Sequence, residues 1–153
     1  MKILLDTHII LWALDDNPKL PLEARTFILD ENNDIYYSTA SVWETAIKFM
    51  SRPDKIWIGG SKLSELCRKM GYRMLPIEDR HVMALETLVC HNQDHNDPFD
   101  RMMIAQAKAD GLKFVTHDYK ISFYEEPCDL YYLASQYLNL YGGTHILDYY
   151  SEN

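Results

Sequence analysis

Short apolar runs alternate with helical patterns along this chain, and this alternation constrains the fold more than any other feature. The runs cover residues 2–6, 34–38, 73–77 and 113–116. Helical patterns cover residues 7–14, 21–31, 40–50, 62–70, 79–89 and 98–110. Strands that alternate with helices pair in parallel and are covered on both faces. The sequence therefore predicts an α/β fold, a three-layer sandwich with a central parallel sheet flanked by helices.

The length and composition are those of one folded domain. The 153 residues suit a single core, and 47% of them are apolar while 25% are charged. The sequence contains no internal repeat and no linker that divides it. We expect one domain over residues 1–153, with a core over about 1–124 that ends on the strand at 113–116. Tyrosines crowd the segment of about 125–153, for which we expect one helix and a tail.

Hydrophobicity, cysteine use and charge limit the environments in which the chain works. The first apolar run is broken by Asp6, and the sequence holds no stretch long enough for a secretory signal or a membrane span. Three cysteines without a CxxC spacing indicate reduced thiols. We therefore expect a cytoplasmic protein with no membrane contact. A net charge of −8 argues against broad affinity for nucleic acid, so a bound metal must offset the acids if such contact occurs.

Four acidic side chains stand where apolar runs end or helical patterns begin: Asp6, Glu44, Asp100 and Asp118. In a fold of this class, ligands bind outside the carboxyl ends of the strands. Acids that leave neighbouring strands at that edge share one crevice, where carboxylates can converge on a hard cation. We therefore predict that these four acids form one metal site.

Asp100 carries the strongest signal of the four. It shares a helical stripe with Met103, Ile104 and Ala107, so the carboxylate belongs to the inward-facing side. A buried carboxylate is costly unless a cation compensates it. Its neighbour Asp97 precedes a proline, which predicts a helix N-cap.

The other acids have structural explanations beside the functional one. Asp6 stands at a strand-to-helix junction, where capping is the better interpretation for this residue alone. Glu44 precedes Lys48 by four residues, the favoured spacing of a surface ion pair, yet it also borders an apolar stripe. That stripe consists of Trp43, Ala46, Ile47 and Met50. Asp118 follows a strand and can stabilise a turn.

His91 and His95 have an i, i+4 spacing that would suit zinc together with Cys90 or Asp97. The residues between the two histidines form a poor helix, and no second ligand pair accompanies them. We therefore interpret both histidines as solvated, or as neighbours of a site rather than zinc ligands.

Each of the four acids stands in a longer segment. The segments are Leu4-Leu5-Asp6-Thr7-His8, Ser41-Val42-Trp43-Glu44-Thr45-Ala46-Ile47-Lys48, His95-Asn96-Asp97-Pro98-Phe99-Asp100-Arg101 with Ile104-Ala105-Gln106-Ala107, and Val115-Thr116-His117-Asp118. Together they resemble the PIN-domain ribonucleases, particularly the VapC-like toxins of bacterial toxin–antitoxin pairs. The resemblance implies a PIN-like sandwich in which the four acids bind metal and are catalytic. It also implies that Asp97 is an accessory residue and that Thr7 is a hydrogen-bonding neighbour of the site.

The resemblance implies a metal-dependent endoribonuclease that leaves a 5′-phosphate and a 3′-hydroxyl. Oxygen ligands favour Mg²⁺ or Mn²⁺. The implied partners are an RNA substrate, a cognate antitoxin and a second copy of the chain in a homodimer. Lys48, Arg101 and Lys120 lie near the acids in sequence, where they can steer phosphate or form salt bridges.

Other functions fit some of the same residues. One is a PIN-type nuclease that works in RNA processing or on DNA without a toxin role. A non-enzymatic alternative is a degenerate PIN fold that only binds. A receiver-like acidic module would have adjacent acids directly after an early strand, whereas Asp15-Asp16 lies far beyond Asp6.

Overall fold

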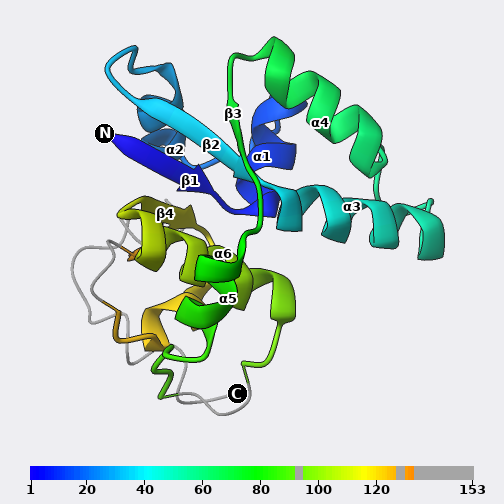
Figure 1. The fold of residues 1–153 in the computed structure, drawn as a ribbon. Coiled ribbons are helices and arrows are strands. Elements are labelled where there is room, and N and C mark those ends of the chain that lie inside the picture. Colours follow the sequence, from blue (N-terminus) through cyan, green and yellow to red (C-terminus); the bar gives the residue numbers. More distant parts are fainter. Residues whose placement is uncertain (92–94, 127–129, 133–153) are drawn as a thin grey trace, which may run out of the picture.

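The computed structural model describes residues 1–91, 95–126 and 130–132, and within them the chain forms a five-stranded parallel sheet (Figure 1). The strands are β1 (Lys2–Leu5), β2 (Asp34–Ser38), β3 (Arg73–Leu75), β4 (Lys113–Thr116) and β5 (Leu130–Tyr132). Their order across the sheet is β3-β2-β1-β4-β5, and every neighbouring pair is parallel. The predicted α/β fold with a parallel sheet is confirmed.

The helices follow the sequence pattern closely. They are α1 (Thr7–Leu14), α2 (Leu22–Leu29), α3 (Thr39–Ser51), α4 (Gly60–Lys69), α5 (Asp79–Leu85), α6 (Pro98–Asp110) and the 3₁₀ helix η1 (Tyr119–Phe123). Helix α5 ends before the predicted residue 89 because the backbone N–H groups of Thr87 and Leu88 bond three residues back instead of four. In the described part of the chain, none of the helices has the length and apolarity needed to cross a bilayer.

Alternation along β1 divides the core into two halves. Ile3 and Leu5 face a cluster that α1, α2 and α4 complete. Leu4 faces the opposite side of the sheet, where α6 contributes Met103 and Ile104. All five side chains are fully buried. Because successive side chains of a strand point to opposite faces, one apolar strand serves both halves of the sandwich.

A fifth strand corrects the prediction that residues 113–116 form the last one. Strand β5 pairs with β4 in parallel, with Val115 opposite Tyr131. The run is only three residues long, too short for a periodic pattern to distinguish it from the surrounding segment rich in leucine and tyrosine. The predicted C-terminal helix and tail fall mainly on residues 133–153, outside the described residues.

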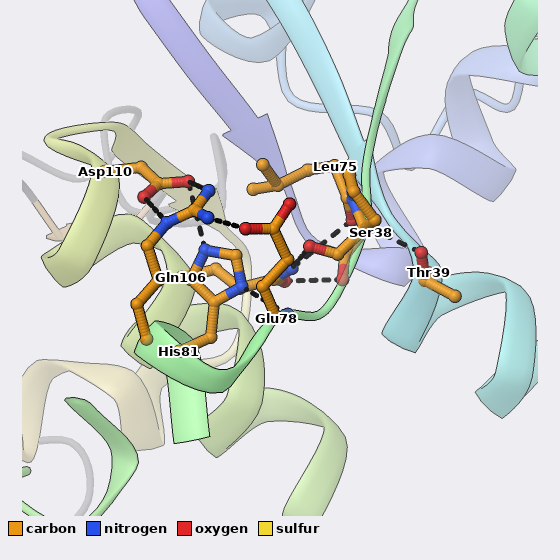
Figure 2. A network of polar contacts seen from close by, with 9 residues as sticks. Ser38, Thr39, Leu75, Glu78, His81, Gln106 and Asp110 are labelled. Atoms are coloured by element: carbon orange, nitrogen blue, oxygen red, sulfur yellow. Dashed lines mark hydrogen bonds and ion pairs between the residues drawn. The ribbon is translucent and has the colours of Figure 1, made fainter. Parts of the chain in front are cut away.

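A polar network fixes α6 against the carboxyl ends of two strands (Figure 2). The Ser38 hydroxyl, at the end of β2, donates a 2.5 Å hydrogen bond to Gln106 Oε1 on α6. The Gln106 amide donates to the Leu75 carbonyl at the end of β3, at 3.3 Å. Both side-chain groups are fully buried, where an unmade hydrogen bond would cost about 1–3 kcal/mol. The position of α6, which carries Asp100, is therefore set by the sheet.

The same figure shows how α5 is tied to the end of α6. His81 Nδ1 accepts from the Glu78 backbone N–H at 3.0 Å, and His81 Nε2 lies 3.0 Å from Asp110 Oδ2. Arg80 adds two bonds to the Asp110 carboxylate, at 2.8 and 3.1 Å. These bonds hold the pKa of Asp110 below its usual range. This histidine and its acidic partner have a structural role.

The apolar stripe of α3 points outward, which contradicts the usual reading of an amphipathic helix. Trp43, Ile47 and Met50 are 55%, 44% and 82% exposed. The buried face instead carries small or polar residues, Ala40, Ser41, Glu44 and Thr45. Helix α4 begins very close to α3, since a Cβ on Gly60 would lie 2.5 Å from the Val42 carbonyl oxygen. Helix α3 thus presents polar side chains to the site and apolar ones to solvent.

Candidate metal centre

One threonine links two acids at the carboxyl edge of the sheet. Asp6 follows β1, and Asp118 lies two residues beyond the end of the neighbouring strand β4. The hydroxyl of Thr116, the last residue of β4, donates a 2.7 Å hydrogen bond to Asp6 Oδ2. The Thr116 hydroxyl oxygen in turn accepts from the Asp118 backbone N–H at 3.0 Å. Sequence reasoning missed Thr116, because a threonine at a strand end looks like an ordinary strand residue.

Asp6 occupies the N-cap position of α1, but its side chain makes no capping hydrogen bond. The carboxylate is 4% exposed and accepts from Thr116 instead. The capping interpretation is therefore wrong for the side chain. Asp118 does stabilise the next turn, since its Oδ1 accepts from the Lys120 backbone N–H at 3.0 Å.

Glu44 reaches the site from α3 and is held there by α1. The Thr7 hydroxyl, in the first turn of α1, donates to Glu44 Oε2 at 2.7 Å, and it lies 2.9 Å from the Ser41 hydroxyl. Lys48 forms an ion pair with the other carboxylate oxygen. Glu44 is 4% exposed, so the surface pair and the inward-pointing acid are both present. Thr7 thus contacts Glu44 directly, and its role beside a metal site stays a prediction.

Helix α6 starts and points as the sequence indicates. Asp97 Oδ1 accepts from the backbone N–H groups of Phe99 and Asp100, at 2.9 and 3.1 Å, which confirms the predicted N-cap. Three residues of the Asp100 stripe, Met103, Ile104 and Ala107, are fully buried. The Asp100 side chain stands at the end of this stripe and is 17% exposed.

His95 contacts Asp100 directly. Its Nε2 lies 3.2 Å from Asp100 Oδ2, and its Nδ1 lies 2.9 Å from the Tyr124 hydroxyl. The ring is buried, and burial lowers the pKa of His95. His91 is exposed and pairs with Glu125. The two histidines thus fall under the two predicted alternatives, since His91 is solvated and His95 is a neighbour of the site.

Three side chains are arranged closely enough to share one ion. Ligand atoms of His95, Asp100 and Asp118 all lie within 4.8 Å of one another. Within the described residues, Asp6 and Glu44 are not part of this closest group. Their charges nevertheless act on Asp100, as its pKa shows. The four acids and His95 therefore lie close enough to interact with one another around Asp100.

The site holds more negative charge than the protein itself compensates. Burial raises the pKa of Asp100 to about 8, with further contributions from Asp6, Asp97, Glu44 and Asp118. Burial also raises the pKa of Asp6. Among the described residues, no lysine or arginine forms an ion pair with Asp6, Asp100 or Asp118. A divalent cation with oxygen ligands fits this arrangement, because it supplies the missing positive charge.

The three basic residues near the acids differ in what they do. Lys48 forms the salt bridge with Glu44 that the sequence allowed. Arg101 is half-buried, and both it and Lys120 help to lower the pKa of His95. Steering of phosphate by Arg101 or Lys120 stays a prediction.

Comparison with known proteins identifies the family. Residues 3–126 match the family model described as PIN domain. A chain in the crystal structure of VapBC2 from Rickettsia felis, bound to a DNA fragment from their promoter, is 16% identical. The likeness covers 87% of this chain and 98% of that chain, with a TM-score of 0.55. A chain in DNA-bound VapBC from Salmonella typhimurium is 15% identical over 83% of this chain and 93% of that chain, with a TM-score of 0.57. No curated protein matches the sequence.

The acidic centre lies at the carboxyl edge of the parallel sheet, where folds of this class bind their ligands. The chain belongs to the PIN domain family, a family of nucleases. The two solved structures share its fold, and at these identities the likeness concerns the fold alone. The resemblance to PIN-domain proteins that the sequence indicated is therefore confirmed. The division of the chain at about residue 124 stays a prediction.

Proposed function

We propose that this protein is a metal-dependent endoribonuclease and the toxin of a toxin–antitoxin pair. The observation that carries the proposal is the buried surplus of carboxylates around Asp100, whose pKa is raised to about 8. Such a centre destabilises the protein unless a cation occupies it. The chain also belongs to a nuclease family, so we propose that the cation takes part in phosphodiester hydrolysis.

Asp6, Glu44, Asp100 and Asp118 are the residues that would hold Mg²⁺ or Mn²⁺. When bound, such an ion lowers the pKa of a water molecule and offsets charge on the phosphodiester. The protein's own contribution is to keep the oxygens in place. Thr116 fixes Asp6 and the backbone of Asp118, while Thr7 fixes Glu44.

His95 orients the carboxylate on which the site depends. Burial lowers the pKa of His95 and so favours a neutral ring. A neutral ring that accepts from the Tyr124 hydroxyl at Nδ1 carries its proton on Nε2, from which it donates to Asp100. This contact resembles the outer hydrogen bonds that orient ligands in metal sites.

The proposed reaction is hydrolysis of a phosphodiester bond in RNA. The oxygen of water bonds to phosphorus, the bond between phosphorus and the 3′ oxygen breaks, and that oxygen leaves with a proton. The products carry a 5′-phosphate and a 3′-hydroxyl. A site made of carboxylates supports this route because it requires no protein nucleophile.

An apolar groove beside the acids supports the proposed antitoxin partner. A cavity of about 190 Å³ is lined by residues of α3, of α6 and of the segment before and within α5: Ala40, Trp43, Ile77, Leu85, Asn96, Pro98, Phe99, Arg101 and Met102. Trp43 and Phe99 form an edge-to-face pair with ring centroids 5.0 Å apart. We propose that an antitoxin segment docks apolar side chains here and presents an arginine or lysine to the acids.

A homodimer is also part of the proposal. The outward stripe of Trp43, Ile47 and Met50 supports it, because exposed apolar side chains favour burial in an interface. Sedimentation velocity of the purified chain measures the assembly. A mass of twice 18.0 kDa is expected, and a monomer at all concentrations tested would contradict it.

The proposed activity is tested by incubating purified protein with total RNA, with and without Mg²⁺, and mapping the new ends. We expect cleavage only with the metal, with 5′-phosphate on the downstream fragments. Asp100→Asn serves as the inactive preparation control, since a contaminating ribonuclease would survive that substitution. Cleavage without metal, or equal cleavage by the variant, would contradict the proposal.

A further inference from the structure

A cavity of about 320 Å³ opens between α1 and the segment that joins α3 to α4. Its lining consists of Thr7, His8, Leu11, Trp12, Asp15, Asn17, Lys48, Arg52, Lys55, Ile56 and Trp57. Two of these residues also belong to the acidic centre, because Thr7 and Lys48 both contact Glu44. The cavity therefore borders the candidate metal centre beside Glu44.

Two tryptophans line this cavity, and they differ in how they are held. The Trp12 ring lies 6.0 Å from His8 and 5.6 Å from His117, edge-on to the latter, so neighbouring rings fix it in place. Trp12 also packs against the core. Trp57 is half-exposed, at 50%. Packing explains the position of Trp12, whereas the exposed face of Trp57 remains available to a flat ligand.

Three cations surround the cavity in a chain whose net charge is −8. Lys48 faces Glu44, and Asp15 is the one acid among the lining residues. In the described part of the chain, neither Arg52 nor Lys55 forms an ion pair with a carboxylate. Positive charge concentrated beside a strongly acidic centre favours an anionic ligand that extends toward that centre.

From these contacts we infer that the cavity is a nucleotide subsite for single-stranded RNA. A base stacks on Trp57, while Arg52 and Lys55 contact the phosphates on either side of it. Lys48 then guides the strand past Glu44 to the metal centre. The inference rests on the proposed ribonuclease function and adds to it the part of the protein that holds the substrate.

Single-stranded nucleic acid fits this cavity better than an acidic protein segment does. The half-exposed indole of Trp57, with Arg52 and Lys55 on the same cavity, matches the alternation of bases and phosphates along a strand. Stacking on an aromatic ring tolerates any base, so the subsite positions RNA without selecting its sequence. The bases of a duplex are stacked on one another and cannot reach Trp57, so the strand must be single at this point.

The inference is tested by the binding of a fluorescein-labelled single-stranded RNA of about ten nucleotides, a length within the usual site sizes. Fluorescence anisotropy is measured in the Asp100→Asn background with Mg²⁺, so that cleavage does not consume the probe. Trp57→Ala is expected to weaken binding about tenfold, the effect of losing one stacked base. Trp57→Phe should restore most of the affinity. Leu29→Ala removes a similarly exposed apolar side chain from α2 and should change nothing.

The two cations are tested by salt dependence. Arg52→Ala with Lys55→Ala should reduce the slope of log K against log salt by about 1.4, since each phosphate contact on a single strand contributes about 0.7. Arg68→Ala with Lys69→Ala, at the end of α4, removes the same charge and is the control. An equal effect of both pairs would overturn the subsite, because only general attraction would then remain.

Two further outcomes overturn the inference. One is unchanged RNA binding by Trp57→Ala. The other is that an oligoglutamate peptide binds as tightly as RNA and that Trp57→Ala weakens both by the same factor. This result would assign the cavity to an acidic protein segment. The proposed function fails separately. Binding through Trp57 without any RNA cleavage by the wild type would overturn the nuclease proposal alone, and cleavage with an unchanged KM in Trp57→Ala would overturn the subsite alone.

Discussion

His95 Nε2 lies 3.2 Å from Asp100 Oδ2, although the two residues were assigned different roles from the sequence. The contact is possible because the Tyr124 hydroxyl holds the other ring nitrogen at 2.9 Å. Tyr124 follows η1, so the segment beyond β4 reaches back to orient an acid on α6. The site therefore combines Asp6, near the start of the chain, with residues that Tyr124 helps to hold near the end of the described core.

Asp100→Asn is expected to reduce RNA cleavage by roughly 100-fold or more, because it removes a ligand charge from the proposed metal centre. The change in volume is small, so the circular dichroism spectrum should stay that of the wild type. Asp79→Asn, at an exposed position on α5, is the matched control and should keep full activity. Full activity of Asp100→Asn would remove this residue from the site.

Without metal, the protein should become less stable as the pH rises. The pKa of Asp100 is raised from 3.8 to about 8, so between these values the folded chain holds a proton that the unfolded chain releases. The contribution of this group to the free energy of unfolding is therefore greatest below pH 3.8. It decreases as the pH rises and levels off above about pH 8. A shift of this size corresponds to a loss of up to about 6 kcal/mol, since each pKa unit is worth about 1.4 kcal/mol.

Urea unfolding in EDTA at several pH values measures this dependence. Asp100→Asn should flatten the curve and be more stable than the wild type at alkaline pH. Asp6→Asn should act in the same direction, since burial also raises the pKa of Asp6. Wild type and Asp100→Asn with parallel curves would show that this carboxyl is not protonated in the folded state.

Divalent ions should control both activity and stability. EDTA is expected to abolish cleavage, and adding back Mg²⁺ or Mn²⁺ to restore it, whereas Zn²⁺ should not substitute well for an oxygen-rich site. A bound ion also stabilises the fold, by about 2.7 kcal/mol at a hundred times its Kd. Differential scanning fluorimetry with each ion reports this as a rise in Tm. Cleavage that resists EDTA would point to the histidines instead, with His8, His95 and His117 the first to substitute.

Thr116→Val should lower activity about 10- to 100-fold while leaving the acids themselves unchanged. The substitution removes the hydroxyl that bonds both Asp6 and the backbone of Asp118. Thr45→Val is the matched control, because the Thr45 hydroxyl is buried without a hydrogen-bond partner in the described residues. Thr45→Val should keep full activity, and its free energy of unfolding should be higher than that of the wild type. Equal activity of the two variants would deny Thr116 its positioning role.

The toxin role predicts that expression of the gene alone stops growth and that co-expression with a neighbouring small gene restores it. The neighbour's product should co-purify with the protein and occupy the groove of Trp43 and Phe99. Charge reversal of its basic residue should release the nuclease activity. Normal growth with the lone gene, and no stable complex, would favour a PIN-type nuclease of RNA processing.

Much of the fold was predictable because local patterns decided it. Apolar runs gave β1, β2 and β4, and the Asp97-Pro98 pair gave the start of α6. Strand β5 was not predictable, because three residues carry no periodic signal and pairing with β4 stabilises them. The apolar stripe of α3 wrongly suggested a buried face, because Trp43, Ile47 and Met50 are exposed and Glu44 is buried. Burial of Glu44 depends on Thr7 from another element, which the periodicity of one helix does not reveal.

The candidate site was predictable only in part. The acids could be named from their places at strand ends and helix starts, and their charges do act on one another around Asp100. Thr116 was missed as part of the site, and for His95 the sequence left a solvated position and a place beside the site equally open. Their roles arise from contacts with Tyr124, Asp6 and Asp118 that bring distant parts of the chain together.

The central claim is that the carboxylates around Asp100 bind a divalent cation, and calorimetric titration with Mn²⁺ tests it most directly. Wild type and the Asp79→Asn control should bind the ion with the same affinity. Asp100→Asn and Asp118→Asn should bind it at least tenfold more weakly, each with an unchanged circular dichroism spectrum. Equal binding by all four proteins, or no binding by the wild type, would contradict the account.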